Sequence, residues 1–306
     1  MKRSPSMVGI WSRRRLVGGR SLIEILVSLV IGAVILGAIL VTVSGTGLSG
    51  RRTDAQARLN DEGQIALNVI ASAVRMAGYW TPNSPIGSVD PVEPLLRGCN
   101  DGFANPTVAN FDGLNCGGPG EGHSIAVRYD AALAGSVARD CLGNTAGGLA
   151  ATGRAENRYY IAISGATGNP ALFCFGNGGG AAPQALVDNV ETMEIRYGVS
   201  PLDAGELPLI IAFLPSAYTG NTTRYVEAPD IADCTGGGGV ADSWCAVTAV
   251  RICVVVRTDD NESDVVGAQY VGCNGQLLSQ PDRRIRRALV TTVSLRNRTA
   301  SAFQEF

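Results

Sequence analysis

The stretch GRSLIEILVSLVIGAVILGAILVTV, residues 19–43, decides how the rest of the chain can be placed. From Ile25 to Val43 its nineteen residues carry no charge. An α-helix rises about 1.5 Å per residue, so this run matches the roughly 30 Å hydrocarbon core of a bilayer. The sequence therefore predicts a membrane-spanning helix over residues 25–43.

The residues before this run form a basic leader. Before residue 21 there are six basic residues and no acidic one: Lys2, Arg3, Arg13, Arg14, Arg15 and Arg20. By the positive-inside rule the leader stays in the cytoplasm, and the chain after about residue 45 lies on the other side of the membrane.

Glu24 places a carboxylate at the mouth of the apolar run. On insertion scales a carboxylate costs about 2.5–3.5 kcal/mol at the centre of a membrane helix and less near its edge. A secretory signal peptide would have a shorter apolar region and an A-x-A-like cleavage site, which residues 45–47 (Gly-Thr-Gly) do not resemble. A simple signal anchor is the other alternative, and neither of them explains Glu24.

The residues GRSLIE, Gly19–Glu24, resemble the class III signal of type IV prepilins and pseudopilins. In that family a prepilin peptidase cuts after the glycine and methylates the new N-terminus, and a glutamate is typical at mature position five. The resemblance implies a cut between Gly19 and Arg20, with Glu24 as the fifth mature residue. Arg20 departs from the family, which usually has phenylalanine there. The new amine could neutralise Glu24 of the same or a neighbouring chain and lower its burial cost.

Eight cysteines lie beyond residue 90: Cys99, Cys116, Cys141, Cys174, Cys234, Cys245, Cys253 and Cys273. Their spacing contains no C-x-x-C, and with His123 as the single histidine a zinc site is the weaker interpretation. Disulfides are favoured over free buried thiols, and they would place this part of the chain in an oxidising compartment such as a bacterial periplasm. Many connectivities are possible. One of them joins sequence neighbours: Cys99 with Cys116, Cys141 with Cys174, Cys234 with Cys245, and Cys253 with Cys273.

A second helical segment is predicted from Arg52 to Met76, where no proline occurs. Apolar residues repeat at helical intervals: Ala55, Leu59, Ala66, Ile70, Ala73 and Ala77. Gly78 is a plausible stop. The glycines at 45, 47 and 50 leave two possibilities open, one long helix or two separate helices.

Beyond Tyr79 the sequence indicates short strands joined by long loops. The candidate strands are Ser124–Tyr129, Arg158–Ser164, Ala171–Phe175, Val190–Tyr197, Leu209–Phe213, Val247–Arg257 and Arg287–Leu295. In Val190–Tyr197 apolar and charged residues alternate, as expected for a sheet with one buried face. The predicted fold class is therefore α+β, with a long N-terminal helix packed on an antiparallel β-rich body that carries disulfides in its loops.

Four blocks beyond the helix look like the PilW group of minor pilins: VRMAGY at 74–79, NRYYIA at 157–162, LVDNVETMEIRYGV at 186–199 and DRRIRRALVTTVSLRNR at 282–298. The resemblance implies a pilin-like fold and a minor pilin that primes type IV pilus assembly and sits at the pilus tip. It also implies its partners: PilV, PilX and FimU types of minor pilin, a PilY-type adhesin, the major pilin and the prepilin peptidase.

Catalytic and ligand sites are expected to be absent. Residues 117–124 match the P-loop outline except that His123 stands where the lysine belongs, and a flexible loop is the better interpretation. The acidic residues of Thr258–Asp264 lack the EF-hand pattern and indicate a solvated hairpin loop. With one histidine and no G-x-S-x-G motif we expect no enzyme and no cofactor.

A dense basic patch outside the leader comprises Arg283, Arg284, Arg286 and Arg287. A solvated entrance to a strand is favoured over a docking surface for an acidic partner subunit, and a contact with DNA is the weakest interpretation. The formal net charge of −2 gives no general reason to expect nucleic acid as a partner.

The organisation that follows is a cytoplasmic leader, 1–19, which is removed; an N-terminal helix, 20–78; and a periplasmic β-rich body, 79–306. The protein would be a single-pass protein of the bacterial inner membrane and later part of a pilus. Two alternatives stay open: a type II secretion pseudopilin of the J type, and a membrane-tethered adhesin or DNA-uptake module that never enters a filament.

Overall fold

The computed structural model describes residues 19, 21–79, 94–118, 122–131, 138–145, 149, 152–179, 182–200, 221–234, 243–259 and 267–299. The predicted strand Leu209–Phe213, residues 1–18 of the leader and Arg20 lie outside these residues. The chain divides into two compact units, Met1–Thr53 and Asp54–Phe306, with α1 (Leu22–Met76) contributing to both.

Helix α1 is one continuous helix of 55 residues, so the alternative of two separate helices is wrong. It begins directly after Ser21, whose carbonyl accepts hydrogen bonds from the backbone N–H groups of Glu24 (3.0 Å) and Ile25 (3.3 Å). Ser21 and Glu24 stand in the S-x-x-E spacing of a capping box, which favours a helix start at this point. The helix ends before Gly78, whose φ of +72° is the left-handed conformation that glycine adopts without strain.

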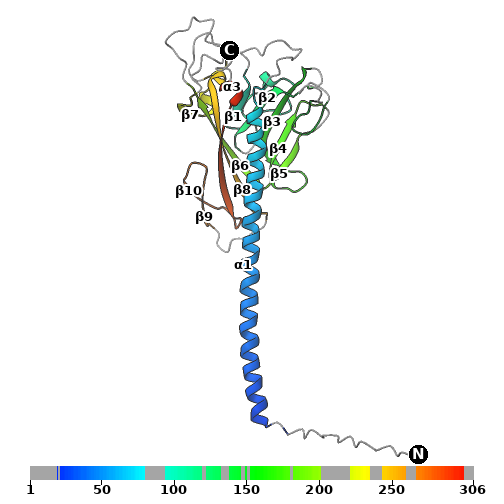
Figure 1. Cartoon of the computed structure of the whole chain (residues 1–306), viewed down its shortest axis with the longest axis vertical. Helices are drawn as coiled ribbons and strands as arrows, with labels where there is room; N and C mark the ends of the chain where they lie inside the picture. The colour runs from blue at the N-terminus through cyan, green and yellow to red at the C-terminus, as the bar shows by residue number, and fades with distance from the viewer. Residues whose placement is uncertain are drawn as a thin grey trace, which may run out of the picture. The chain divides into compact units, whose positions relative to one another are not determined.

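The second unit contains two larger antiparallel sheets and a small hairpin (Figure 1). The five-stranded sheet has the order β1-β2-β3-β4-β5 and is formed by Leu96–Cys99, Ser124–Asp130, Arg154–Ile163, Pro170–Gly176 and Gln184–Asp188. The four-stranded sheet has the order β11-β8-β6-β7 and is formed by Arg286–Ser294, Val247–Arg257, Val190–Val199 and Arg224–Val226. Strands β9 (Gln269–Val271) and β10 (Leu277–Ser279) form the hairpin. Short helices are η1 (Phe111–Gly113), η3 (Ala228–Asp230), η4 (Trp244–Ala246) and α3 (Arg296–Thr299).

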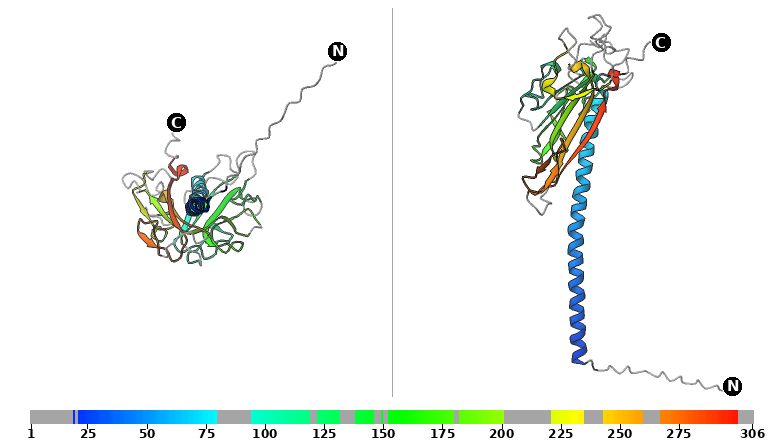
Figure 2. Two further views of the ribbon diagram at one scale, coloured as in Figure 1. Left: turned by 90° about the horizontal axis from the view of Figure 1, so that it is seen from below. Right: turned by 90° about the vertical axis from the view of Figure 1, so that its left-hand side faces the viewer.

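Within this unit the last turns of α1 lie between the two larger sheets (Figure 2). The helix residues in the core are Leu59, Ala66, Leu67, Ile70, Ala71, Ala73, Val74 and Ala77. Five of the six residues predicted to form the apolar face are among them, and Ala55 is half-buried. At Gly63 the helix packs tightly on β11, since an added Cβ would clash with a methyl group of Leu289.

The predicted strands correspond to β2, β3, β4, β6, β8 and β11, and in β6 Met193, Ile195 and Tyr197 are fully buried. Glu194 and Arg196 lie between them on the other face. The fold class, a long N-terminal helix with an antiparallel β-rich body, is confirmed. Strands β1, β5, β7, β9 and β10 were not predicted; they are three to five residues long.

His123 links the two sheets rather than forming part of a phosphate loop. Its backbone N–H donates to the Met193 carbonyl at 2.8 Å, and its Nδ1 accepts from the Ile195 N–H at 2.9 Å. Burial lowers the pKa of His123, so the ring is neutral at pH 7 and can accept this bond. The residue stands immediately before β2 and therefore ties the start of that strand to β6.

Candidate functional site

The start of α1 carries the predicted processing and assembly residues that the structure describes. Gly19 is exposed and lies outside the helix, and Glu24 lies in the first helical turn. Glu24 is the only charged residue between Leu22 and Thr42. A carboxylate in the first turn is favoured by the helix macrodipole, by about 0.3–1 kcal/mol at an exposed site. That is less than the cost of a carboxylate at membrane depth, so the dipole alone does not account for a buried Glu24.

The segment Leu22–Thr42 is long and apolar enough to cross a membrane, with a mean hydropathy of 2.8. None of it is buried within the described chain. Many large apolar side chains on an uncovered helix are unfavourable in water, so this segment requires a membrane or other apolar surfaces around it.

The four arginines of the predicted patch at the start of β11 differ in how exposed they are. Arg286 is buried, whereas Arg283 and Arg287 are exposed and Arg284 is half-buried. The Arg286 guanidinium contacts Glu191 at 2.5 and 2.8 Å and Asp282 at 2.6 Å. Arg286 therefore holds β11 to β6, and its guanidinium is not on the proposed docking surface.

The ion pair between Arg286 and Asp282 also changes the pKa of Asp282. Its hydrogen bond with Arg286 is the main cause that lowers the pKa of Asp282 to about 2. The carboxylate is therefore ionised throughout the physiological pH range and keeps Arg286 neutralised. The pair belongs to the architecture of the sheet.

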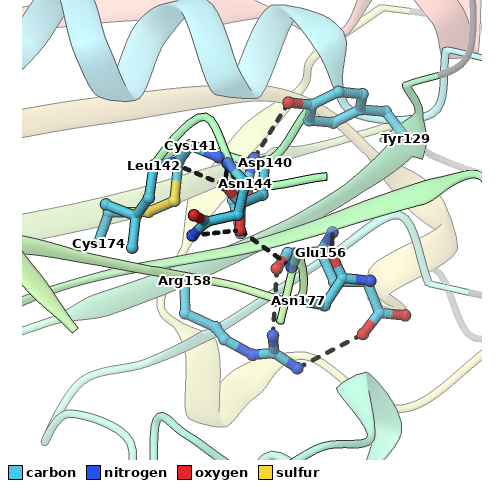
Figure 3. Close-up of a disulfide and its surroundings, with 11 residues drawn as sticks. Tyr129, Asp140, Cys141, Leu142, Asn144, Glu156, Arg158, Cys174 and Asn177 are labelled. Carbon is cyan, nitrogen blue, oxygen red and sulfur yellow. Dashed lines mark hydrogen bonds and ion pairs between the residues drawn. A yellow bond between two sulfur atoms is a disulfide. The ribbon is translucent and has the colours of Figure 1, made fainter. Parts of the chain in front are cut away.

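All eight cysteines are paired, in the set that joins sequence neighbours. Figure 3 shows Cys141–Cys174, which fastens a loop to β4. Next to it the buried Asp140 carboxylate accepts backbone N–H bonds from Leu142, Asn144 and Gly178 at 2.8–2.9 Å. The disulfide and this carboxylate therefore hold a loop that has little regular structure of its own.

The end of α1 is held by a residue that the sequence analysis did not single out. The side-chain Nδ2 of Asn297, on α3, lies 3.1 Å from the Arg75 carbonyl, 3.4 Å from that of Met76 and 3.1 Å from that of Ala77. The last carbonyls of a helix have no partner within the helix. The Asn297 amide, in the C-terminal block, supplies these carbonyls with a hydrogen-bond donor, although it lies more than two hundred residues later in the sequence.

Within the described part of the chain, no group of three or more His, Cys, Asp or Glu side chains is arranged to hold a metal ion. Residues 260–264 of the acidic loop Thr258–Asp264 lie outside the described residues. The features that the structure does bring together are the uncovered apolar helix, a disulfide-bonded body and ion pairs within its sheets.

A long N-terminal helix with an apolar, membrane-length start leads into an antiparallel β-rich body, which is the architecture expected from the resemblance to type IV pilins. Residues 158–297 match the family PilW, described as type IV pilus-assembly protein W, which confirms the PilW resemblance over β3 to α3. The match does not include α1, so it rests on the β-rich body alone. Over residues 158–297 the chain is thus similar to a type IV pilus-assembly protein, and its described residues include one helix suited to membrane anchoring.

Among solved structures, a type IV-like pilin from Thermus thermophilus is similar at 14% identity and a TM-score of 0.36. The similarity covers 78% of this chain and 98% of that pilin. No curated protein sequence matches the chain significantly.

Proposed function

We propose that the chain is a membrane-inserted precursor that is cut between Gly19 and Arg20 and then serves as a minor pilin. It helps to initiate type IV pilus assembly and occupies the tip complex with other minor pilins. The observation that carries the proposal is the uncovered helix Leu22–Thr42, whose single charge is Glu24. The PilW match in the body favours pili over other membrane-anchored assemblies.

The proposed chemistry is a pairing of charges. A cut after Gly19 makes Arg20 the first residue and gives it a free α-amine, four residues before Glu24. Removing one carboxylate from water costs several kcal/mol, and an amine within hydrogen-bond distance offsets much of that cost. A subunit whose amine meets Glu24 of its neighbour can therefore enter the apolar core of a filament. The basic leader keeps the N-terminus cytoplasmic until the cut, and the disulfide-bonded body is periplasmic.

The cut is tested by mass spectrometry of the mature N-terminus of the chain isolated from membranes. The expected terminus is Arg20 with one added methyl group, and the same strain without its prepilin peptidase should retain residues 1–19. A leader that remains on the chain in the wild-type strain would contradict the proposal.

The charge pairing is tested by Glu24→Ala and Glu24→Gln in full-length protein. Both variants should be inserted and cut normally, yet be depleted at least about tenfold from sheared filaments, because the neighbour's amine has no carboxylate to meet. Ser28→Ala is the matched control, since Ser28 lies one turn further on and donates to the Glu24 carbonyl at 2.7 Å without adding charge. Normal recovery of Glu24→Ala in filaments would show that the pairing is not required.

A deletion strain separates this function from that of a J-type pseudopilin. Loss of surface pili with secretion intact supports the pilus, whereas loss of type II secretion with normal pili supports the pseudopilin. An uncut chain that is absent from sheared pili would instead point to a membrane-tethered binding module.

A further inference from the structure

The outward face of the four-stranded sheet is hollowed by a groove of about 640 Å³. Its floor is set by the strand register. One row across β6, β8 and β11 is Glu194, Cys253 and Val290. Cys253 is bonded to Cys273, which brings the β9–β10 hairpin against this floor, and residues 271–275 line the groove.

The next row places two arginines directly opposite each other. Arg196 on β6 is the register partner of Arg251 on β8, and both line the groove. Like charges directly opposite on one sheet face are destabilising. Arg196 is compensated by Glu227 at 3.1 Å, but Arg251 is exposed and no carboxylate of the described residues lies within ion-pair distance of it.

The same sheet contains an arginine pair that is fully compensated. Arg257 on β8 and Arg286 on β11 are also register partners. Glu191 contacts both, at 3.7 Å and 2.5 Å, and Asp282 contacts Arg286. Within ion-pair distance the sheet therefore supplies two carboxylates for this pair, and only Glu227 for Arg196 and Arg251. Glu194, in the adjacent row of the same face, forms no ion pair with either arginine, so Arg251 has no paired carboxylate among the described residues.

Aliphatic side chains are uncovered in the groove and beside it. Val271 on the hairpin (55% exposed) and Val290 on β11 (46% exposed) line the groove, and Leu277, the register partner of Val271, is 64% exposed. Large aliphatic side chains that gather beside an uncompensated charge are typical of an interface with another protein. A small anion would satisfy Arg251 but would leave these side chains in water.

We propose that this groove docks a segment of another pilus subunit that presents a carboxylate beside aliphatic side chains. The carboxylate pairs with Arg251, and the aliphatic residues pack on Val271, Leu277 and Val290. The chemistry of the segment follows from the groove, whereas its assignment to a pilus subunit rests on the proposed function.

The test uses full-length protein in piliated cells, with a photo-crosslinking amino acid in place of Leu277. The expected product joins the chain to another pilus subunit, identified by mass spectrometry. Adding Arg251→Glu should reduce its yield about tenfold, and Arg251→Lys should reduce it less, because reversing one charge of an interfacial pair weakens binding strongly. Arg139→Glu is the control, since Arg139 is exposed beside the Cys141–Cys174 disulfide of the five-stranded sheet and does not line the groove.

Each outcome decides one point. A product that persists in Arg251→Glu, or is lost equally in Arg139→Glu, overturns the role of Arg251. Absence of a product while the chain is present in sheared pili overturns the docking site and leaves the proposed function standing. Another outcome is that the chain is absent from pili and gives an Arg251-dependent product with a protein from outside the pilus. That result would support the groove as a docking site, but it would contradict both the pilus partner and the proposed function.

Discussion

Glu62 is an acidic residue that α1 carries to the edge of the core, close to Asp188 and Asp259. Burial raises the pKa of Glu62 above its ordinary value of 4.5, and both aspartates raise it further, while a hydrogen bond from Asn189 opposes them. Because the folded-state pKa is raised, the ionised form is disfavoured in the native protein. Glu62 therefore destabilises the fold as the pH rises above about 4.5.

Glu62→Gln is accordingly expected to stabilise the protein at pH 7, by less than about 1 kcal/mol, because the side chain is only half-buried and solvent screens it. The difference from wild type should disappear as the pH falls below about 4, where both side chains are neutral. Thermal unfolding between pH 3 and 7 measures it, with Asp61→Asn as the control because Asp61 is exposed one residue earlier. A variant less stable than wild type at pH 7 would mean that Glu62 gains more from its contacts than it loses by burial.

Gly98 lies against the hydroxyl of Tyr197. An added Cβ would be 1.7 Å from that oxygen and 3.1 Å from the Ser124 carbonyl. Tyr197 is fully buried and packs edge-to-face on Trp244 at 4.9 Å, so it has little room to withdraw. Gly98→Ala should therefore cost about 1–3 kcal/mol, as overpacking in a core does.

The matching variant is Tyr197→Phe. The Tyr197 hydroxyl is buried without a hydrogen-bond partner among the described residues, so its removal should be close to neutral or stabilising. In a double-mutant cycle, Gly98→Ala should then cost less in the Tyr197→Phe background. Chemical denaturation gives the four free energies of unfolding, and a cost above about 1 kcal/mol for Tyr197→Phe alone would reveal a partner for the hydroxyl.

At the scale of single elements, the contact between α3 and the end of α1 shows how the C-terminal block supports the long helix. Asn297→Ala should cost about 0.5–1.5 kcal/mol, because the carbonyls of Arg75 and Ala77 lose a donor. Asn297→Asp should cost more, since a carboxylate cannot donate and is repelled at the negative end of the helix dipole. Urea unfolding measures both variants, and Ser294→Ala, at an exposed site on β11, is the control. Equal stability of the Ala and Asp variants would contradict the capping role.

Elements with a strong local pattern were predictable from the sequence. The helical face of α1 and the alternation in β6 follow from periods that depend only on neighbouring residues. Strand β1 reads Leu-Arg-Gly-Cys, and β7, β9 and β10 have three residues each, too few for a period to be visible. Such strands exist because a neighbouring strand or a disulfide holds them in place.

Some residues of the candidate sites were likewise predictable from local sequence, and others were not. Glu24 was recognisable because a charge in an apolar run is unusual in any context. The basic patch was misjudged at Arg286, because its partner Glu191 is 95 residues away and becomes adjacent only through the β6–β8–β11 register. Asn297 and Arg251 are likewise ordinary in the sequence, and their contacts or lack of them arise from the tertiary structure.

At the scale of the whole molecule, the second compact unit includes the last turns of α1 as part of its core. A fragment of residues 54–306, exported to an oxidising compartment, should therefore fold with its four disulfides formed and unfold cooperatively. A fragment of residues 79–306 should not. It lacks Leu59, Leu67, Ile70 and Val74, which are buried between the sheets.

The free energy that these four side chains contribute by burial is the basis for this prediction. Burying one such aliphatic side chain contributes about 1.5–3 kcal/mol, so losing four removes about as much free energy as a domain of this kind has in total. Size-exclusion chromatography and near-ultraviolet circular dichroism should show aggregated or molten 79–306 beside monomeric 54–306. A peptide of residues 54–79 added during refolding should rescue the shorter fragment in part, because it restores the missing helix. If 79–306 alone unfolds with the same midpoint as 54–306, the helix is not part of the core, and the body would have to be stable on its sheets and disulfides alone.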